Sequence, residues 1–93
     1  MQKYPTGRLL LTRGVADRLV EDSGFAEFVW ESLLRHADAD WGGLSEEDKQ
    51  ENEYSLKKSL RLLSAYKRDG MPKIWVITDA DRSVTTVLFS EEY

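Results

Sequence analysis

Acidic residues beside two glycines are the first candidates for metal chemistry. Counting from Asp38 as the first position of an EF-hand loop, Asp40 is third, Gly43 is sixth and Lys49 is twelfth. Such a loop needs glycine at the sixth position and a bidentate glutamate at the twelfth. Gly43 meets the first requirement, but Lys49 cannot serve as the carboxylate ligand. This run therefore predicts a turn and a helix cap rather than a calcium site.

The later acidic run, Asp79-Ala80-Asp81, has Val84 where an EF-hand loop requires glycine. The chain has no cysteine, so thiolate zinc sites, disulfides and a cysteine nucleophile are excluded. It also has no Gly-rich phosphate loop and no dinucleotide-binding fingerprint. We therefore predict that the chain uses neither a metal nor a cofactor.

Acid–base chemistry would have to use His36, the single histidine, or the pair Asp79 and Asp81. His36 falls at the end of a predicted helix, where we expect it at the rim of the core, with no evident serine or aspartate partner. The aspartate pair falls in a predicted turn, where both carboxylates would be solvated. We predict no catalytic residues, and a small enzyme built on one of these groups is the third alternative for function.

Charge is unevenly distributed along the chain. The sequence has 17 acidic and 13 basic residues, and this net charge of −4 argues against direct nucleic-acid binding. Residues 38–53 contain seven acids and one lysine, whereas residues 54–73 contain six basic residues and Asp69. The basic stripe, with tyrosines nearby, supports an alternative function as a small nucleic-acid-associated regulator. Its members are Lys57, Lys58, Arg61, Lys67, Arg68 and Lys73.

The acidic segment 38–53 is the predicted partner-binding surface. Its helical part offers little apolar surface to a core, and clustered like charges are mildly destabilising, which favours a role in binding. Trp41 within it is either a lid folded onto the core or an exposed anchor for a partner, and we favour the lid. Solubility alone is the simpler explanation of the charge. The predicted binding residues are Asp38, Asp40, Trp41, Glu46, Glu47 and Glu51.

Three helices are predicted before the strands. Thr12 is the expected N-cap of a helix over 13–22, whose apolar face carries Val15, Ala16, Leu19 and Val20. Asp22-Ser23-Gly24 ends that helix and caps a second over 25–36, whose apolar stripe comprises Phe25, Phe28, Val29, Trp30, Leu33 and Leu34. Ser45 is the expected N-cap of a third helix, which is polar in its early turns and should lie on the surface with one face in solvent.

The remainder of the chain predicts a three-stranded β-meander. Strands are expected over 60–66, 73–78 and 83–89, separated by turn sequences. Apolar residues at both alternating positions place strand 73–78 centrally and Trp75 in the core. Thr85-Thr86 indicates that the last strand lies at an edge.

A short apolar segment over 8–12 predicts an additional N-terminal strand. Together these elements predict a single α+β domain over 1–93, with two to three N-terminal helices packed on a small antiparallel sheet. No run approaches the roughly 20 apolar residues of a membrane-spanning helix, and residues 1–14 lack a secretory pattern. We therefore expect a cytoplasmic protein that acts without a membrane. The sequence leaves self-association open.

Several runs also resemble a known family: Asp40-Trp41-Gly42-x-Leu44 with Glu47-Asp48 and Asn52, Arg61 to Tyr66, Lys73 to Leu88, and Glu92-Tyr93. The family consists of small bacterial proteins carried on plasmids and other mobile elements. Its members are commonly labelled "plasmid-related protein" or, by automatic transfer, "type I restriction endonuclease subunit M". The resemblance is dense from residue 34 onward, and the family often has aspartate where this chain has Gly43.

The resemblance implies a context rather than a reaction. A modification subunit needs a cofactor pocket and a catalytic motif that these 93 residues do not contain, and the family offers no catalytic residues to carry over. It implies a bacterial cytoplasm and a mobile genome, where small non-enzymatic proteins often inhibit host defences or adjust plasmid upkeep. The expected function is a binding module that modulates a larger bacterial protein or nucleoprotein complex, such as a restriction or CRISPR-type defence complex.

Overall fold

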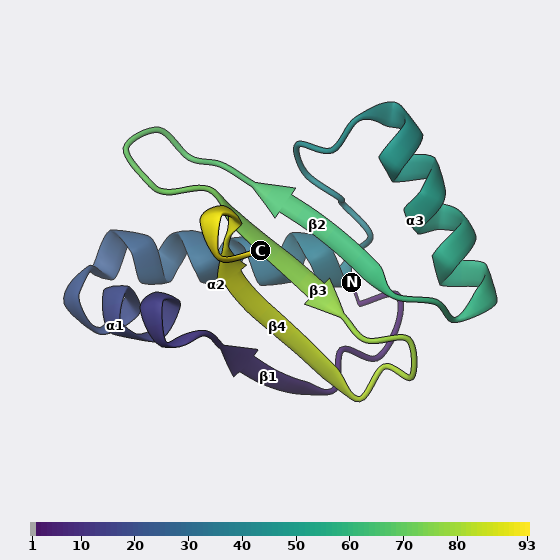
Figure 1. Ribbon diagram of the computed structural model, residues 1–93, viewed down its shortest axis with the longest axis horizontal. Helices are drawn as coiled ribbons and strands as arrows, with labels where there is room; N and C mark the ends of the chain where they lie inside the picture. The colour runs from purple at the N-terminus through teal and green to yellow at the C-terminus, as the bar shows by residue number, and fades with distance from the viewer. Residues whose placement is uncertain (1) are drawn as a thin grey trace.

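The computed structural model describes residues 2–93 as three α-helices packed with a four-stranded sheet (Figure 1). Helix α2 crosses one face of the sheet, α1 packs beside α2, and α3 lies next to β2. The fold is α+β, as predicted. The elements in chain order are β1 (Arg8–Leu11), α1 (Arg13–Glu21), α2 (Ser23–Ala37), α3 (Glu46–Lys58), β2 (Leu62–Tyr66), β3 (Ile74–Thr78), β4 (Val84–Phe89) and the short 3-10 helix η1 (Ser90–Glu92).

The helices begin at the predicted caps. The hydroxyls of Thr12 and Ser45 each accept a hydrogen bond from the backbone N–H three residues later. Asp22 serves two helices, because its own N–H donates to the carbonyl of Arg18 in α1 and its carboxylate accepts from the N–H of Phe25 in α2. These bonds satisfy groups that helix ends otherwise leave unpaired, so α2 can follow α1 directly.

The strand order is β1-β4-β3-β2, which confirms the central position predicted for β3. The prediction that the last strand lies at an edge is wrong. The N-terminal strand adds to β4 in parallel, with Leu9 opposite Thr85, so β4 becomes internal and the sheet is mixed rather than wholly antiparallel. The pairing joins segments from opposite ends of the chain, and no local pattern around Thr85 could reveal it.

The main core lies between α2 and one face of the sheet. Its fully buried apolar residues are Val15, Phe25, Ile74, Val76 and Val87. Three residues that were assigned to apolar helix faces are exposed instead, namely Val20 by 87%, Trp30 by 62% and Leu34 by 52%. The apolar stripes of α1 and α2 are thus wider than the surface that they cover, and the excess stays in solvent.

Trp75 is only partly buried, contrary to its predicted place in the core. It lies on the sheet face opposite to α2 and stacks on Tyr93 with ring centroids 4.5 Å apart, because η1 turns the C-terminus over β3 (Figure 1). The Trp75 indole N–H is buried without a hydrogen-bond partner among residues 2–93. The alternation in β3 was predicted correctly, but the two faces of the sheet are not equally covered.

The outer side of β2 is closed by the chain that precedes it. The carboxamide of Asn52 in α3 donates to the carbonyl of Leu63 and accepts from its N–H. The N–H of Gly43 donates to the carbonyl of Ala65 at 2.8 Å, and the N–H of Ala65 donates to the carbonyl of Trp41 at 3.4 Å. The backbone groups at this edge of the sheet are therefore paired, although β2 is the last strand.

Candidate functional site

Helix α3 carries the exposed acids of the predicted binding segment. The cap at Ser45 starts it, three acids occupy its first turn, and Lys57 and Lys58 occupy its last turn, which suits the helix dipole at both ends. Only Asn52 and Ser55 are buried, and Asn52 holds the helix to β2 through its carboxamide. As predicted, α3 lies on the surface with most of its side chains in solvent.

Glu47, Glu51 and Tyr54 follow one another at spacings of four and three residues, which aligns them on one ridge of α3. Together with Gln50 they line a shallow hollow, and the Tyr54 side chain is 56% exposed. We call Glu47, Gln50, Glu51 and Tyr54 the acidic face of α3. Glu46 is also exposed and lies 3.8 Å from the Lys49 ammonium. The structure thus brings Glu47 and Glu51 together around an aromatic ring.

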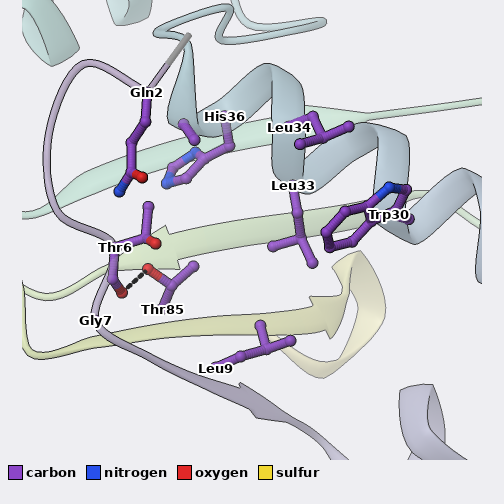
Figure 2. A pocket seen from close by; sticks show the side chains of 10 residues that line it. Gln2, Thr6, Gly7, Leu9, Trp30, Leu33, Leu34, His36 and Thr85 are labelled. Atoms are coloured by element: carbon purple, nitrogen blue, oxygen red, sulfur yellow. Dashed lines mark hydrogen bonds between the residues drawn. The ribbon is translucent and has the colours of Figure 1, made fainter.

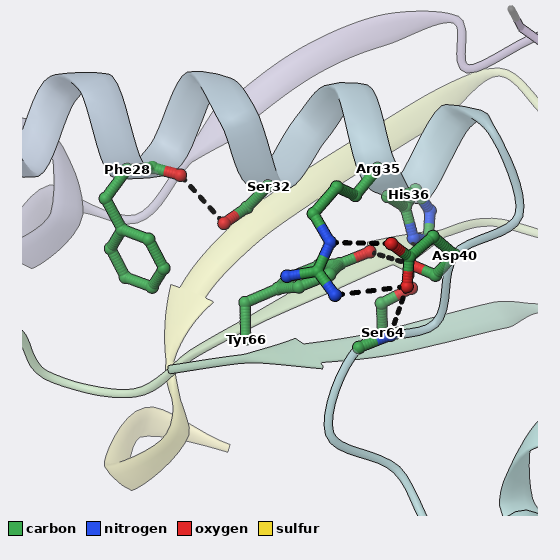
Figure 3. Close-up of polar contacts among 8 residues, drawn as sticks. Phe28, Ser32, Arg35, His36, Asp40, Ser64 and Tyr66 are labelled. Atoms are coloured by element: carbon green, nitrogen blue, oxygen red, sulfur yellow. Dashed lines mark hydrogen bonds and ion pairs between the residues drawn. The ribbon is translucent and has the colours of Figure 1, made fainter. Parts of the chain in front are cut away.

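Asp38 and Asp40 lie on a different element, the turn that ends α2. Asp38 is the C-cap of α2. Asp40 forms a two-point ion pair with Arg35, with Oδ2 at 2.7 Å from Nε and Oδ1 at 3.1 Å from Nη2 (Figure 3). The hydrogen bond from Arg35 lowers the pKa of Asp40 below its usual value. This carboxylate is already paired within the chain and holds the turn in place.

The Arg35–Asp40 pair also rests on Tyr66. The Arg35 guanidinium lies 4.9 Å from the centroid of the Tyr66 ring, and the Tyr66 hydroxyl donates to the backbone carbonyl of Asp40 at 2.6 Å (Figure 3). Burial raises the pKa of Tyr66 above its usual value. These contacts give Asp40 a structural role, so of the predicted binding residues it is among the least free to engage a partner.

Trp41 is buried, with 4% of its surface exposed. It packs against Leu62 and Tyr4 in a second core cluster and meets the His36 ring edge-on at 5.8 Å. Its indole N–H donates to the Glu53 carboxylate at 2.7 Å. The structure confirms that Trp41 is a lid over the core. It is not an exposed anchor, so the predicted surface loses its aromatic at this position. The exposed aromatic nearby is Tyr54, one residue beyond the segment.

His36 is fully buried rather than at the rim of the core, and both ring nitrogens are paired. Nδ1 lies 2.5 Å from Oγ of Ser64, and Nε2 lies 2.8 Å from Oγ1 of Thr78 (Figure 3 shows Ser64). Thr78 is in turn 2.7 Å from Oγ1 of Thr85, which donates to the carbonyl of Thr6 at 2.6 Å. A chain of hydrogen bonds therefore links α2 with β2, β3, β4 and the N-terminal segment.

The last bond in this chain determines the direction of the others. Because Thr85 donates its proton to a carbonyl, it must accept from Thr78, and Thr78 must then accept from His36 Nε2–H. His36 Nδ1 is left as an acceptor for the Ser64 hydroxyl. Burial, with a smaller contribution from the charge of Arg82, lowers the pKa of His36 to about 4. The imidazole is therefore neutral at pH 7, with one assigned tautomer.

The Ser64–His36 contact joins a hydroxyl to an imidazole, as in a nucleophile–base pair. Both side chains are fully buried in the core, where a substrate has no direct approach to the Ser64 oxygen. The contact is the kind that buried polar side chains normally make, since each of the two groups has a hydrogen-bond partner in the core. The sequence did contain a signal for it: Ser64, Thr78 and Thr85 occupy inward positions of their strands, where a polar side chain needs a buried partner.

The basic stripe of residues 57–73 is divided by the fold. Lys57 and Lys58 lie at the end of α3, before β2, whereas Lys67 and Arg68 follow β2. The Lys67 ammonium donates to the carbonyls of Arg68 and Met71. Arg68 contacts the carboxylates of Glu27 and Glu31 and lies over the Phe28 ring. The two ends of the stripe are therefore separated by a strand, and one end is partly neutralised.

Within residues 2–93, no group of three or more histidine or acidic side chains is arranged to hold a metal ion. The carboxylate of Asp81 instead accepts hydrogen bonds from the backbone N–H and the hydroxyl of Ser83, which fits the turn predicted there.

No helix within residues 2–93 combines the length and apolar character that a membrane span requires.

Sequence reasoning missed an apolar groove beside β1. A hollow of about 270 Å³ lies between α2 and the N-terminal segment, with Trp30 and Leu33 of α2 facing Leu9 of β1 (Figure 2). A second hollow of about 280 Å³ shares these three residues and continues toward Leu11 and Leu19. We call this the β1 groove. The sequence feature that could have indicated this groove is the wide apolar stripe of α2, because that stripe is wider than the area that one face of the sheet can cover.

No protein-family model, curated protein or solved structure matches the chain. The resemblance drawn from its sequence runs therefore stays an expectation. The exposed surfaces have to be interpreted from their own chemistry, and the strongest of those predicted is the acidic face of α3.

Proposed function

We propose that the protein is a non-catalytic binding module that modulates a larger bacterial protein machine through the acidic face of α3. The observation that carries this proposal is the composition of that face. Glu47, Glu51 and the 56% exposed Tyr54 share one ridge of a helix that buries only Asn52 and Ser55. None of these three side chains belongs to the hydrophobic core.

The chemistry of this face defines the kind of partner. Two carboxylates beside an exposed tyrosine match a basic surface with an apolar or cationic contact for the ring. A basic groove that normally holds nucleic acid offers such a surface, and regularly spaced carboxylates on a helix can occupy it. Together with the family resemblance, this favours a restriction or CRISPR-type host-defence complex as the target.

The test compares three tagged proteins as baits in a bacterial lysate, with bound proteins identified by mass spectrometry and then measured as purified pairs. The baits are the wild type, Glu47→Lys/Glu51→Lys, and the control Glu21→Lys/Glu91→Lys, whose positions are exposed on other elements. Both variants change the net charge equally. We expect Glu47→Lys/Glu51→Lys to weaken binding by about 100-fold or more and to alter its salt dependence, because like charges would then meet.

A control variant that loses the partner to the same extent would show that total charge, and not this face, governs binding. A Glu47→Lys/Glu51→Lys variant that folds and binds as tightly as the wild type would reject the acidic face of α3. Salt-sensitive binding of duplex or single-stranded DNA by the wild type, lost on Lys57→Glu/Lys58→Glu, would instead support the nucleic-acid alternative.

A further inference from the structure

The two edges of the sheet are treated differently by the fold. At β2, the carboxamide of Asn52 and the backbone of Gly43 pair with the outward groups of the strand. At β1, no element of residues 2–93 lies beyond the strand (Figure 1). An uncovered edge strand presents a row of backbone donors and acceptors to another chain.

The outward groups of β1 can be identified from its pairing with β4. The N–H groups of Arg8 and Thr12 donate to the carbonyls of Ser83 and Val87, at 2.8 and 3.1 Å. In a parallel ladder the alternate residues point the other way. The N–H and carbonyl groups of Leu9 and Leu11 therefore face outward, away from the sheet.

The side chains around this edge are apolar and exposed. Leu9 is 49% exposed on the α2 side of the sheet, where Trp30 and Leu34 are 62% and 52% exposed. Leu10 is 44% exposed on the opposite face. The free edge thus runs beside the β1 groove, with apolar side chains available on both faces of the sheet.

We propose that β1 is the interface between two copies of this chain, paired antiparallel about a two-fold axis at Leu10. In this register Leu9 of one copy is opposite Leu11 of the other, and each such pair exchanges two hydrogen bonds. The outward N–H and carbonyl groups of Leu9 and Leu11 are then all hydrogen-bonded in both copies. Sliding one strand by two residues in either direction would leave some of them without a partner in the other strand. The two Leu10 residues form the central pair, with Cα atoms about 4.5 Å apart.

Charge complementarity at the ends of the strand supports a second copy as the occupant. The same register places Arg8 beside Thr12 of the second copy, on the face that carries Leu10. The Thr12 hydroxyl donates to the Glu92 carboxylate at 2.8 Å. In the proposed dimer, Arg8 of each copy therefore lies near the Glu92 carboxylate of the other copy, and the two-fold symmetry places one such contact at each end of the interface.

The strand pairing is short, so side-chain contacts must contribute to the stability of the dimer as well. β1 has four residues, and the register supplies four backbone hydrogen bonds. Leu9 and Leu11 of opposite copies meet beside the β1 groove, where the exposed Trp30 of each copy can be covered. The interface is separate from the acidic face of α3, so Glu47→Lys/Glu51→Lys should leave the dimer unchanged.

The test uses opposite charges at the two-fold axis. Sedimentation over a concentration series should show a wild-type dimer, while Leu10→Glu and Leu10→Lys each raise the dissociation constant by about 100-fold or more, because like charges meet at the axis. Mixing Leu10→Glu with Leu10→Lys should restore a dimer. The control pair Val20→Glu and Val20→Lys, at a position that is 87% exposed on α1, should dimerise as the wild type does. Circular dichroism and thermal melting confirm that each variant is folded.

Hydrogen exchange provides an independent readout of the register. The amides of Leu9 and Leu11 should become protected as concentration rises in the wild type but not in Leu10→Glu, whereas the amide of Leu10, which faces β4, should be protected in both. A wild type that stays monomeric, a folded Leu10→Glu that dimerises normally, or a mixture that stays monomeric overturns the proposal. Protection of Leu9 and Leu11 only after another protein is added would assign the edge to a foreign strand and would overturn it as well.

Discussion

The carboxamide of Asn52 pairs with both backbone groups of Leu63, as a neighbouring strand would. Its Nδ2 donates to the Leu63 carbonyl at 2.5 Å, and its Oδ1 accepts from the Leu63 N–H at 3.2 Å. We predict that Asn52→Asp destabilises the fold by about 1–3 kcal/mol, because a carboxylate would oppose the Leu63 carbonyl without donating to it. The free energy of unfolding from urea titrations measures this.

Asn52→Asp is close in shape to the native side chain, so the loss would come from the hydrogen bonds rather than from packing. The matched control is Gln50→Glu, an amide-to-acid change two residues away in the same helix, at an exposed position. It should change stability by less than about 0.5 kcal/mol. Equal effects of the two variants would mean that added charge on α3, and not the pairing with Leu63, is responsible.

His36 should make the fold sensitive to mild acid. Its pKa of about 4 in the folded protein lies below the usual 6.5, so below pH 6.5 the unfolded chain binds the proton more readily. Stability that is fully present above pH 6.5 is therefore lost as pH falls toward 4, by about 3 kcal/mol in total. Urea titrations between pH 7.5 and pH 5 should follow this direction.

The histidine assignment can be checked without unfolding the protein. NMR of the single imidazole should show a neutral Nε2–H tautomer whose chemical shifts stay constant from pH 8 to pH 5.5. Among variants, His36→Gln should lose most of the pH dependence of stability in this range, since the carboxylates titrate at lower pH. An imidazole that titrates near pH 6.5 would contradict the buried hydrogen-bond chain.

The tryptophans should differ in their access to solvent. We expect acrylamide to quench the fluorescence of Trp30, which is 62% exposed, far more than that of Trp41, which is 4% exposed. The measurement uses variants that keep one tryptophan each, with the others replaced by phenylalanine. If Trp41 were quenched as efficiently as Trp30, the lid would be open in solution and the anchor alternative would return.

Trp75 should contribute less to stability than a core aromatic. We predict that Trp75→Ala costs about 2 kcal/mol, against about 3–5 kcal/mol for Phe25→Ala, because Phe25 is fully buried whereas Trp75 is partly covered by Tyr93. The free energy of unfolding of each variant is measured by denaturant titration. The two values can be compared if the variants have equal m-values, because the surface exposed on unfolding is then the same. A larger loss from Trp75→Ala would show that the C-terminal stack is a second core.

Features that depend on neighbours within a few residues could be predicted from the sequence. The caps at Thr12, Asp22 and Ser45 each bond to an N–H three residues away, and the alternation in β3 depends only on the two-residue period of a strand. The exposed acids of α3 followed from the same kind of pattern, since a polar helix has no face to bury.

Features that depend on distant segments were decided by the tertiary structure alone. The parallel pairing of Leu9 with Thr85 made β4 internal, and the limited area of the sheet left Trp30 in solvent. The ring partners of His36 come from two strands, β2 and β3, and Thr78 extends the chain of hydrogen bonds to β4. Trp41 became a lid because Leu62 and Tyr4 lie beneath it. Local periodicity states which side of an element is apolar, but strand order and the area of each layer determine whether that side is covered.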